Sequence, residues 1–346
     1  VFYFPPSEYV LGGWDPGVYT ASGVSIAKHG GINFQNPLLA GLDAGERSLF
    51  SARRYGLQEF YPAWRIPAAG GGNVLSPQFF HMYPVLLSLT SAIGGVWGCL
   101  CTNPAIALLC MIALYGLCRS LSGSGVAFMA PMLFLVCPVQ IWLARFQNSE
   151  MLGQLCFLAG FGMLFLAVRL AANLSDKTAG GRVAAAYVVS ALFFGVSMLT
   201  RAELVPASIL ILAMGIISLG WGPPPGPVRK GRAAWAVCMA VLLVHAYVYQ
   251  STVASLYTPL GPLWKWGAAA IVAAVCAAAI MRTFREFVER VWGLIGMPVR
   301  LAAAAGLVIA LLYVVFVRVQ HKSLGLERFT YHDIAILLSW PVKQLA

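Results

Sequence analysis

Long apolar stretches recur along most of this chain, and they limit the folds that it can adopt. From Cys99 onward, runs with few charged residues follow one another. Each is about 18 to 22 residues long, which is enough for a helix to cross a bilayer. The runs are continuous and do not alternate between apolar and polar residues, so they do not match the strands of a transmembrane β-barrel. The sequence therefore predicts an all-α fold, a polytopic transmembrane helical bundle.

The composition excludes several other classes of protein. Hydrophobic residues make up 60% of the 346 positions and charged residues only 10%, whereas soluble domains carry about 25% charged residues. A soluble enzyme, a secreted disulfide scaffold and a disordered tail are excluded. The net charge of +11 does not indicate nucleic-acid binding, because the basic residues lie in short clusters between apolar segments, as the positive-inside rule expects.

About eight spans are predicted from length and hydropathy. They cover residues 103–118, 125–143, 150–172, 183–200, 203–221, 233–250, 264–281 and 300–319. The linkers between them alternate from Arg119 onward: one set is rich in Lys and Arg, and the other is less basic and holds Glu150, Glu203 and Glu327. We assign the basic linkers to the cytoplasm and the other linkers to the opposite side of the membrane.

Residues 1–98 differ from the bundle predicted at 99–346. Positions 1–79 are rich in Gly, Pro, aromatic and charged residues, and a short helix is expected from Tyr19 to His29. The stretch 80–98 is apolar but interrupted by Pro and Gly, so it either crosses the membrane fully or lies at its interface. We favour the interface, which predicts a large non-cytoplasmic first loop that carries juxtamembrane helices.

The chain starts at Val1 rather than at a methionine, and it shows no signal peptide. We expect a first membrane span to precede this residue in a longer protein.

Asp15 is the first candidate for chemistry. It stands among Gly, Pro and aromatic residues in positions 12–19, directly before the predicted helix. One interpretation is a helix cap, with Pro16 in the first turn. The other is a general base that accepts a proton from a hydroxyl group beside the membrane. The two interpretations remain about equally good on the sequence alone.

His81 opens the ambiguous stretch and has two interpretations as well. A lone histidine at a membrane interface is usually a polar anchor, and the neighbouring Tyr83 is typical of the aromatic belt. The functional alternative is a partner for a proton, a phosphate or a metal near Asp15.

Two short outer connectors hold the remaining candidates. Arg145 and Glu150 bracket residues 146–149, and Arg201 and Glu203 interrupt a long apolar stretch. These residues are either simple end anchors or groups that face a cavity, because charges in such places are costly unless they meet water or a partner. The functional interpretation of Arg201 is bidentate recognition of a lipid-linked phosphate.

In their order along the chain and their predicted side of the membrane, these four candidate motifs resemble those of the GT-C superfamily of integral membrane glycosyltransferases. The resemblance is greatest to bacterial members similar to dolichyl-phosphate-mannose mannosyltransferases. The resemblance covers about residues 9–205 and depends on the sequence WDPGVY at 14–19, on HMYP at 81–84 and on the outer turn 145–150. It implies a helical bundle in the bacterial inner membrane with its active site facing outward. It also implies transfer of a sugar, with inversion, from a polyprenyl-phosphate donor to a hydroxyl of a lipid, glycan or protein.

The resemblance also implies roles for single residues. Asp15 would deprotonate the acceptor, and Arg201, together with Arg145 or His81, would hold the phosphate leaving group. Glu150 and Glu203 would orient the arginines or bind sugar hydroxyls, and Tyr19 belongs to the substrate-binding motif. Many relatives have two adjacent acidic residues where this chain has Asp15 followed by Pro16, so a divalent metal stays open as a cofactor.

Two other functions compete with sugar transfer. A transporter or flippase of a lipid-linked substrate needs polar residues at mid-membrane depth, whereas the charges here lie at segment ends on one predicted side. A membrane scaffold without catalysis is the third possibility, and it predicts that the change of Asp15 to Asn is silent.

Overall fold

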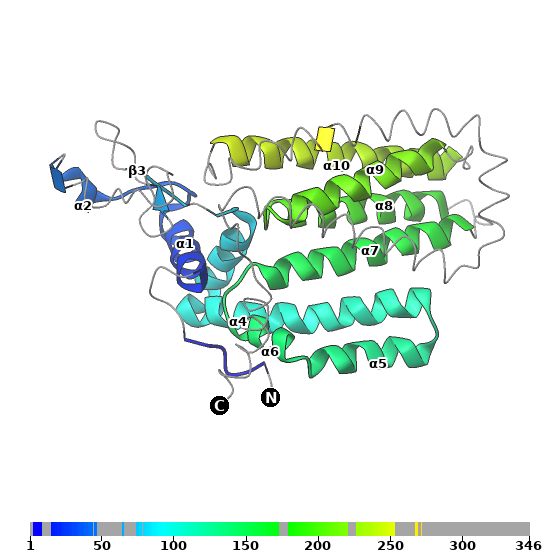
Figure 1. Ribbon diagram of the computed structural model, residues 1–346, viewed down its shortest axis with the longest axis horizontal. Coiled ribbons are helices and arrows are strands. Elements are labelled where there is room, and N and C mark those ends of the chain that lie inside the picture. The colour runs from blue at the N-terminus through cyan, green and yellow to red at the C-terminus, as the bar shows by residue number, and fades with distance from the viewer. Residues whose placement is uncertain are drawn as a thin grey trace, which may run out of the picture. The chain divides into compact units, whose positions relative to one another are not determined.

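A computed structural model of the chain describes residues 3–8, 15–43, 45–46, 64–65, 74–77, 79–172, 179–220, 226–252, 267–268 and 271 (Figure 1). Helices account for nearly all of these residues, which confirms the predicted all-α class. Four of the described helices are long and apolar enough to cross a membrane, or five if one bent pair counts as a single span. The chain is therefore built as a polytopic helical membrane protein.

The chain divides into two compact units. The first contains Val1–Ala159, Leu199–Ala202 and His245–Thr258, and the second contains Gly160–Met198, Glu203–Val244 and Pro259–Ala346.

The predicted spans correspond to helices over much of the chain. Helix α7 covers Glu150–Ala172, α8 Ala179–Met198, α9 Leu204–Gly220 and α10 Gly226–Thr252. The ends of these helices lie within about seven residues of the ends of the predicted spans, and the largest difference is at the start of α10. The apolar part of α9, Leu204–Ile216, is shorter than the other spans. The spans predicted at 264–281 and 300–319 lie outside the described residues, apart from three positions.

Helix α4, Met82–Leu121, contains a sharp break at Gly94 and Gly95. The first limb folds back beside the start of the second limb, as two contacts between them show. Cys99 Sγ lies 3.4 Å from the Leu87 carbonyl oxygen, and the Thr102 hydroxyl lies 2.8 Å from the Thr90 hydroxyl. The second limb corresponds to the span predicted at 103–118. The first limb does not continue it in line.

The turn of α4 requires glycine at two positions. Gly95 has φ 58° and ψ −145°, a conformation that is almost confined to glycine, and a Cβ atom at Gly98 would overlap the carbonyl oxygen of Thr90. We expect Gly95→Ala and Gly98→Ala each to lower the free energy of unfolding by about 1–3 kcal/mol. Thermal unfolding in detergent would measure the loss.

Gly116 provides a matched control for this prediction. It lies in the second limb of the same helix with open space around its Cα, so Gly116→Ala should be neutral or should stabilise by about 0.5–1 kcal/mol through helix propensity. Equal effects at all three positions would contradict the proposed turn.

The span predicted at 125–143 corresponds to a bent pair of helices. It consists of α5, Ser124–Leu135, and α6, Pro138–Arg145, which are bent by 62° relative to each other. Pro138 occupies the first turn of α6, where its missing N–H group ends the hydrogen-bond ladder from α5. Hydropathy is continuous across this bend and does not reveal it.

Helix α1, Asp15–His29, packs against the first limb of α4. It contains the predicted helix but begins four residues earlier, at Asp15. Its buried face is made of small residues together with Val18 and Tyr19, and the Cα of Gly23 approaches Leu87 so closely that a Cβ would lie 2.5 Å from the Leu87 Cβ. This close contact fixes Asp15 and Tyr19 relative to α4.

A small sheet follows α1. Strands β1, Phe34–Gln35, and β2, Trp64–Arg65, both pair antiparallel with β3, Val74–Pro77, in the order β1-β3-β2. Helix α2, Pro37–Ala40, lies between β1 and β2 in sequence, and the side chain of Asn36 caps it. The sheet leads the chain from β3 to Phe79 and His81 at the start of α4.

Much of the helix surface is apolar and exposed. Ile112 in α4, Leu133 in α5 and Val237 in α10 are each more than 60% exposed. Large exposed apolar surfaces mark contact with a membrane or a partner, and the length of these helices identifies lipid as the surrounding medium.

Candidate functional site

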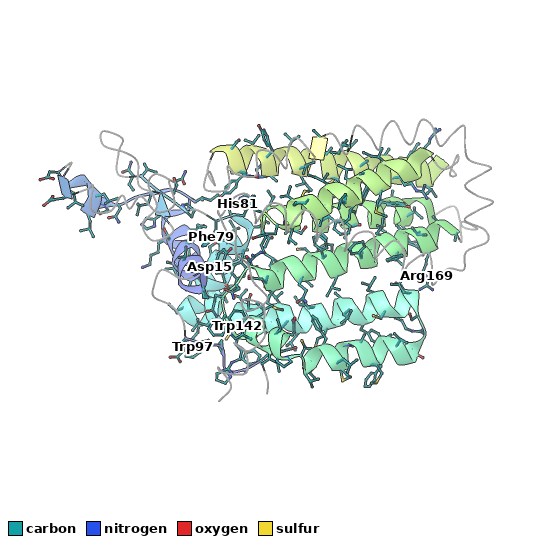
Figure 2. The ribbon with its side chains drawn as sticks, in the orientation of Figure 1. Asp15, Phe79, His81, Trp97, Trp142 and Arg169 are labelled. Atoms are coloured by element: carbon teal, nitrogen blue, oxygen red, sulfur yellow. The ribbon has the colours of Figure 1, made fainter. Side chains whose placement is uncertain are left out.

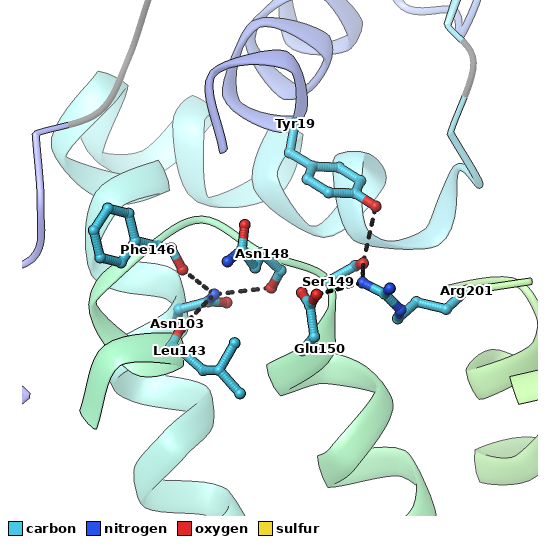
Figure 3. A network of polar contacts seen from close by, with 8 residues as sticks. All are labelled: Tyr19, Asn103, Leu143, Phe146, Asn148, Ser149, Glu150 and Arg201. Atoms are coloured by element: carbon cyan, nitrogen blue, oxygen red, sulfur yellow. Dashed lines mark hydrogen bonds and ion pairs between the residues drawn. The ribbon is translucent and has the colours of Figure 1, made fainter. Parts of the chain in front are cut away.

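Arg201 lies at the centre of a polar cluster in the first unit (Figure 3). Its Nη1 atom is 2.6 Å from Glu150 Oε1 and donates a hydrogen bond to Ser149 Oγ at 3.2 Å. Glu150 is the first residue of α7, whereas Arg201 belongs to the short segment Leu199–Ala202. Two of the candidate residues, which are far apart in sequence, are thus a direct ion pair.

Tyr19 joins helix α1 to this cluster. Its hydroxyl lies 2.9 Å from Ser149 Oγ, and its ring stacks on Phe79 at 4.6 Å between centroids. Tyr19 is buried, so the structure gives it a positioning contact rather than an open binding face.

Asp15 precedes Tyr19 by four residues on the same helix. Residues at this spacing lie on one face, about 6 Å apart along the axis. Asp15 is exposed at the start of α1, where Figure 2 labels it. Asp15 therefore lies one helical turn before Tyr19, whose hydroxyl contacts Ser149.

The turn between α6 and α7 has more buried polar groups than its backbone needs. Gln147, Asn148 and Ser149 are all buried. Within the described part of the chain, Gln147 Oε1, Asn148 Oδ1 and Glu150 Oε2 are buried without a hydrogen-bond partner. Buried acceptors in this state are costly, and hydroxyl groups of a ligand are donors of the kind that would satisfy them.

His81 belongs to a neighbouring cluster in the same unit. Its ring lies 4.2 Å from that of Tyr249 and 5.7 Å from that of His245. The next residue, Met82, donates a backbone hydrogen bond to Leu199 at 3.2 Å, so His81 lies close to the segment of Arg201. Burial, with a smaller effect of His245, lowers the pKa of His81 from 6.5 to about 4. Histidine at this position is neutral at pH 7.

Stability should therefore depend on His81 in weakly acidic solution. Between pH 6.5 and pH 4 the unfolded chain binds a proton that the folded protein excludes, so the free energy of unfolding falls as the pH falls through this window. The loss is at most about 3 kcal/mol, and it is absent above pH 6.5. In His81→Gln this part of the dependence should disappear, as measured by thermal unfolding between pH 4 and pH 7.5.

His29 supplies the control for that measurement. It is an exposed histidine at the end of α1, and His29→Gln should reproduce the unaltered curve. Parallel curves for His81→Gln and the unaltered protein would show that the acid sensitivity has another origin.

The structure gives Arg145 a different environment. Its Nε atom donates to the carbonyl oxygen of Pro5 at 3.0 Å, and its own carbonyl oxygen accepts from Ser7 N at 2.8 Å. These contacts attach the segment 3–8 to the end of α6. Glu203 belongs to the second unit, where it is exposed just before α9. The structure thus brings together Tyr19, Glu150 and Arg201, with Asp15 on the adjoining turn of α1.

Two residues of the site were not selected on sequence grounds. Asn103 contacts the turn, and Tyr83 contacts Asn103. Asn103 had a recognisable signal, because an amide within an apolar segment is expensive unless it has a structural or functional use. Ser149, which contacts both Tyr19 and Arg201, belongs to the polar outer turn that the sequence had already marked as a candidate to face a cavity.

Comparisons with known proteins do not classify the chain. No protein-family model, no curated protein and no solved structure matches it. Among the residues that the structure describes, no group of three or more His, Cys, Asp or Glu side chains converges that could hold a metal ion. The fold and the helix lengths define an integral membrane protein with several spans.

Proposed function

We propose that this protein is an integral membrane glycosyltransferase of the GT-C type. It would move a sugar from a polyprenyl-phosphate donor to a hydroxyl group of an acceptor lipid, glycan or protein. The donor, the acceptor and the surrounding lipids are the proposed partners.

The main support is the Arg201–Glu150–Ser149–Tyr19 cluster with Asp15 one helical turn away. Sugar transfer from a lipid phosphate needs a cation for the leaving group and a carboxylate for the attacking hydroxyl. Arg201 is partly exposed, with 23% of its side chain accessible, and we propose that its guanidinium group contacts the donor phosphate. Its contact with Glu150 fixes the plane of the guanidinium group, which favours two-point contact with a phosphate.

In the proposed reaction Asp15 accepts the proton of the acceptor hydroxyl. The hydroxyl oxygen forms a bond to the anomeric carbon as the bond from that carbon to the phosphate oxygen breaks. Polyprenyl phosphate leaves with the bonding electrons, and Arg201 offsets its added negative charge. Attack from the side opposite the phosphate inverts the anomeric centre. The proton ends on Asp15 and the bonding electrons on the phosphate, so atoms and charge balance without a further reactant.

The position of the cluster along the helices agrees with an active site at one membrane boundary. Glu150 is in the first turn of α7 and Arg169 is in its last turn, a separation of about 30 Å by helical rise, which is the thickness of the hydrocarbon core. The basic end would face the cytoplasm and the cluster the outside. We propose the bacterial inner membrane as its location.

The direct test is a transfer assay in lipid nanodiscs. The purified full-length protein would be supplied with radiolabelled polyprenyl-phosphate sugars and with membrane extracts as the source of acceptor. Label should move from the donor to a product that survives mild acid, and Arg201→Gln should abolish that movement. If no donor is consumed but labelled lipid crosses the membrane of proteoliposomes, the protein is a flippase and the transferase proposal is wrong.

A further inference from the structure

One buried side chain of α4 holds the turn on which the cluster depends. Asn103 is 0% exposed. Its Nδ2 atom donates to the carbonyl oxygens of Asn148 at 2.9 Å and Leu143 at 3.4 Å, and also to that of Phe146 (Figure 3). Leu143 and Phe146 lie at the end of α6, where helix carbonyls lack partners within the helix. A single amide from another helix therefore caps α6 and fixes the turn that follows it.

The other end of the same amide faces Tyr83. Asn103 Oδ1 accepts a hydrogen bond from the Tyr83 hydroxyl at 2.9 Å. The Tyr83 ring is fully buried and packs nearly perpendicular to the Tyr19 ring, with 5.1 Å between centroids. The nitrogen and the oxygen of Asn103 are both engaged, so the amide has one orientation. It links α4 to the turn and, through Tyr83, to the ring of Tyr19.

The residues that follow the turn are those of the candidate site. Ser149 comes directly after Asn148 and receives the hydrogen bond from Arg201, and Glu150 is the ion-pair partner of Arg201. A shift of the turn would move both contacts of the guanidinium group. The acceptor oxygens without a partner in this turn belong to side chains, whereas Asn103 holds the backbone, so the two sets of groups do not compete.

We propose that Asn103 is a positioning residue, which places Ser149 and Glu150 so that Arg201 is held in its binding orientation. Its effect on catalysis rests on the proposed glycosyltransferase function, whereas its effect on the turn does not. Loss of a residue with only a packing role would lower the stability of the whole protein. It would not loosen the turn more than the rest of the structure.

The test compares Asn103→Leu with Thr102→Val in nanodiscs. Both variants remove a buried polar group from adjacent positions of one helix. Within the described residues, however, the Thr102 hydroxyl bonds to Thr90 and Gly98 and not to the turn. Amide hydrogen exchange of residues 146–150, measured by mass spectrometry, should be about tenfold faster in Asn103→Leu, as expected for the loss of a hydrogen bond. In Thr102→Val it should be unchanged.

Transfer activity provides the second readout. Asn103→Leu should lower kcat/KM for the donor by about tenfold or more, since a misplaced binding group of this kind costs at least one hydrogen bond in the transition state. Thr102→Val should keep kcat/KM within about twofold. If Asn103→Leu fails to fold, Tyr83→Phe loses only the bond to Oδ1, and it should show a smaller change of the same kind in both measurements.

The outcomes separate the two proposals. Equal exchange in both variants, or fast exchange with normal kcat/KM, would overturn the positioning role. If the unaltered protein transfers no sugar from any donor, the proposed function fails, and exchange in the turn still decides whether Asn103 holds it.

Discussion

Replacing Asp15 with Asn should lower the rate of sugar transfer by about 100-fold or more and leave the protein folded. General-base catalysis contributes about 10² to 10⁴ to a rate, and Asn has nearly the same shape as Asp but does not accept a proton. Asn also suits the start of a helix as well as Asp does, so α1 should still begin at position 15. The measurement is kcat with a saturating donor, together with the thermal midpoint of each variant.

Asp43 offers a matched control for this prediction. Its carboxylate accepts from the backbone N–H of Glu46 at 2.8 Å on the exposed part of the first loop, away from the cluster around Arg201. Asp43→Asn should keep normal transfer. Normal transfer in Asp15→Asn, at an unchanged thermal midpoint, would show that Asp15 is a helix cap and that another group takes the proton.

The sequence was sufficient for those parts of the fold that depend on local pattern. Hydropathy predicts α7 and α10 because a helix in lipid must be apolar over its whole length. The pair Gly94-Gly95 indicates the break in α4, and Asp15 with Pro16 marks the start of α1. Hydropathy alone does not reveal the bend between α5 and α6, because Ile141, Trp142 and Leu143 keep the stretch apolar beyond Pro138.

The candidate site depends on contacts that no local pattern contains. The charges predicted that Glu150 and Arg201 lie on one side of the membrane, but side alone does not pair them. The contact of Tyr19 with Ser149 joins positions 130 residues apart, and it results from the close packing of α1 on the first limb of α4. Arg145 has the same charge and the same predicted side as Arg201, yet the structure pairs it with the backbone of Pro5.

Removing the charge of Arg201 should have an effect as large as the loss of Asp15. Stabilisation of a developing negative charge by one preorganised donor is worth about 10²- to 10³-fold in rate, so Arg201→Gln should reduce kcat by that factor. Arg201→Lys keeps the charge but lacks the planar fork, and it should recover only part of the activity. Arg145→Gln is the matched control and should keep normal kcat, because Arg145 contacts the segment 3–8 instead.

A double-mutant cycle with Glu150 would separate the orienting contact from simple stability. The side chains of Arg201 and Glu150 are 23% and 34% exposed, and ion pairs of this exposure contribute only about 0.2–1 kcal/mol to folding. Glu150→Gln should therefore leave the thermal midpoint nearly unchanged and reduce kcat by about tenfold, since the guanidinium group loses its orientation. In the Arg201→Gln background the same change should have little further effect, because Glu150 acts through Arg201. Additive losses in the double variant would mean that Glu150 contacts the substrate by itself, independently of Arg201.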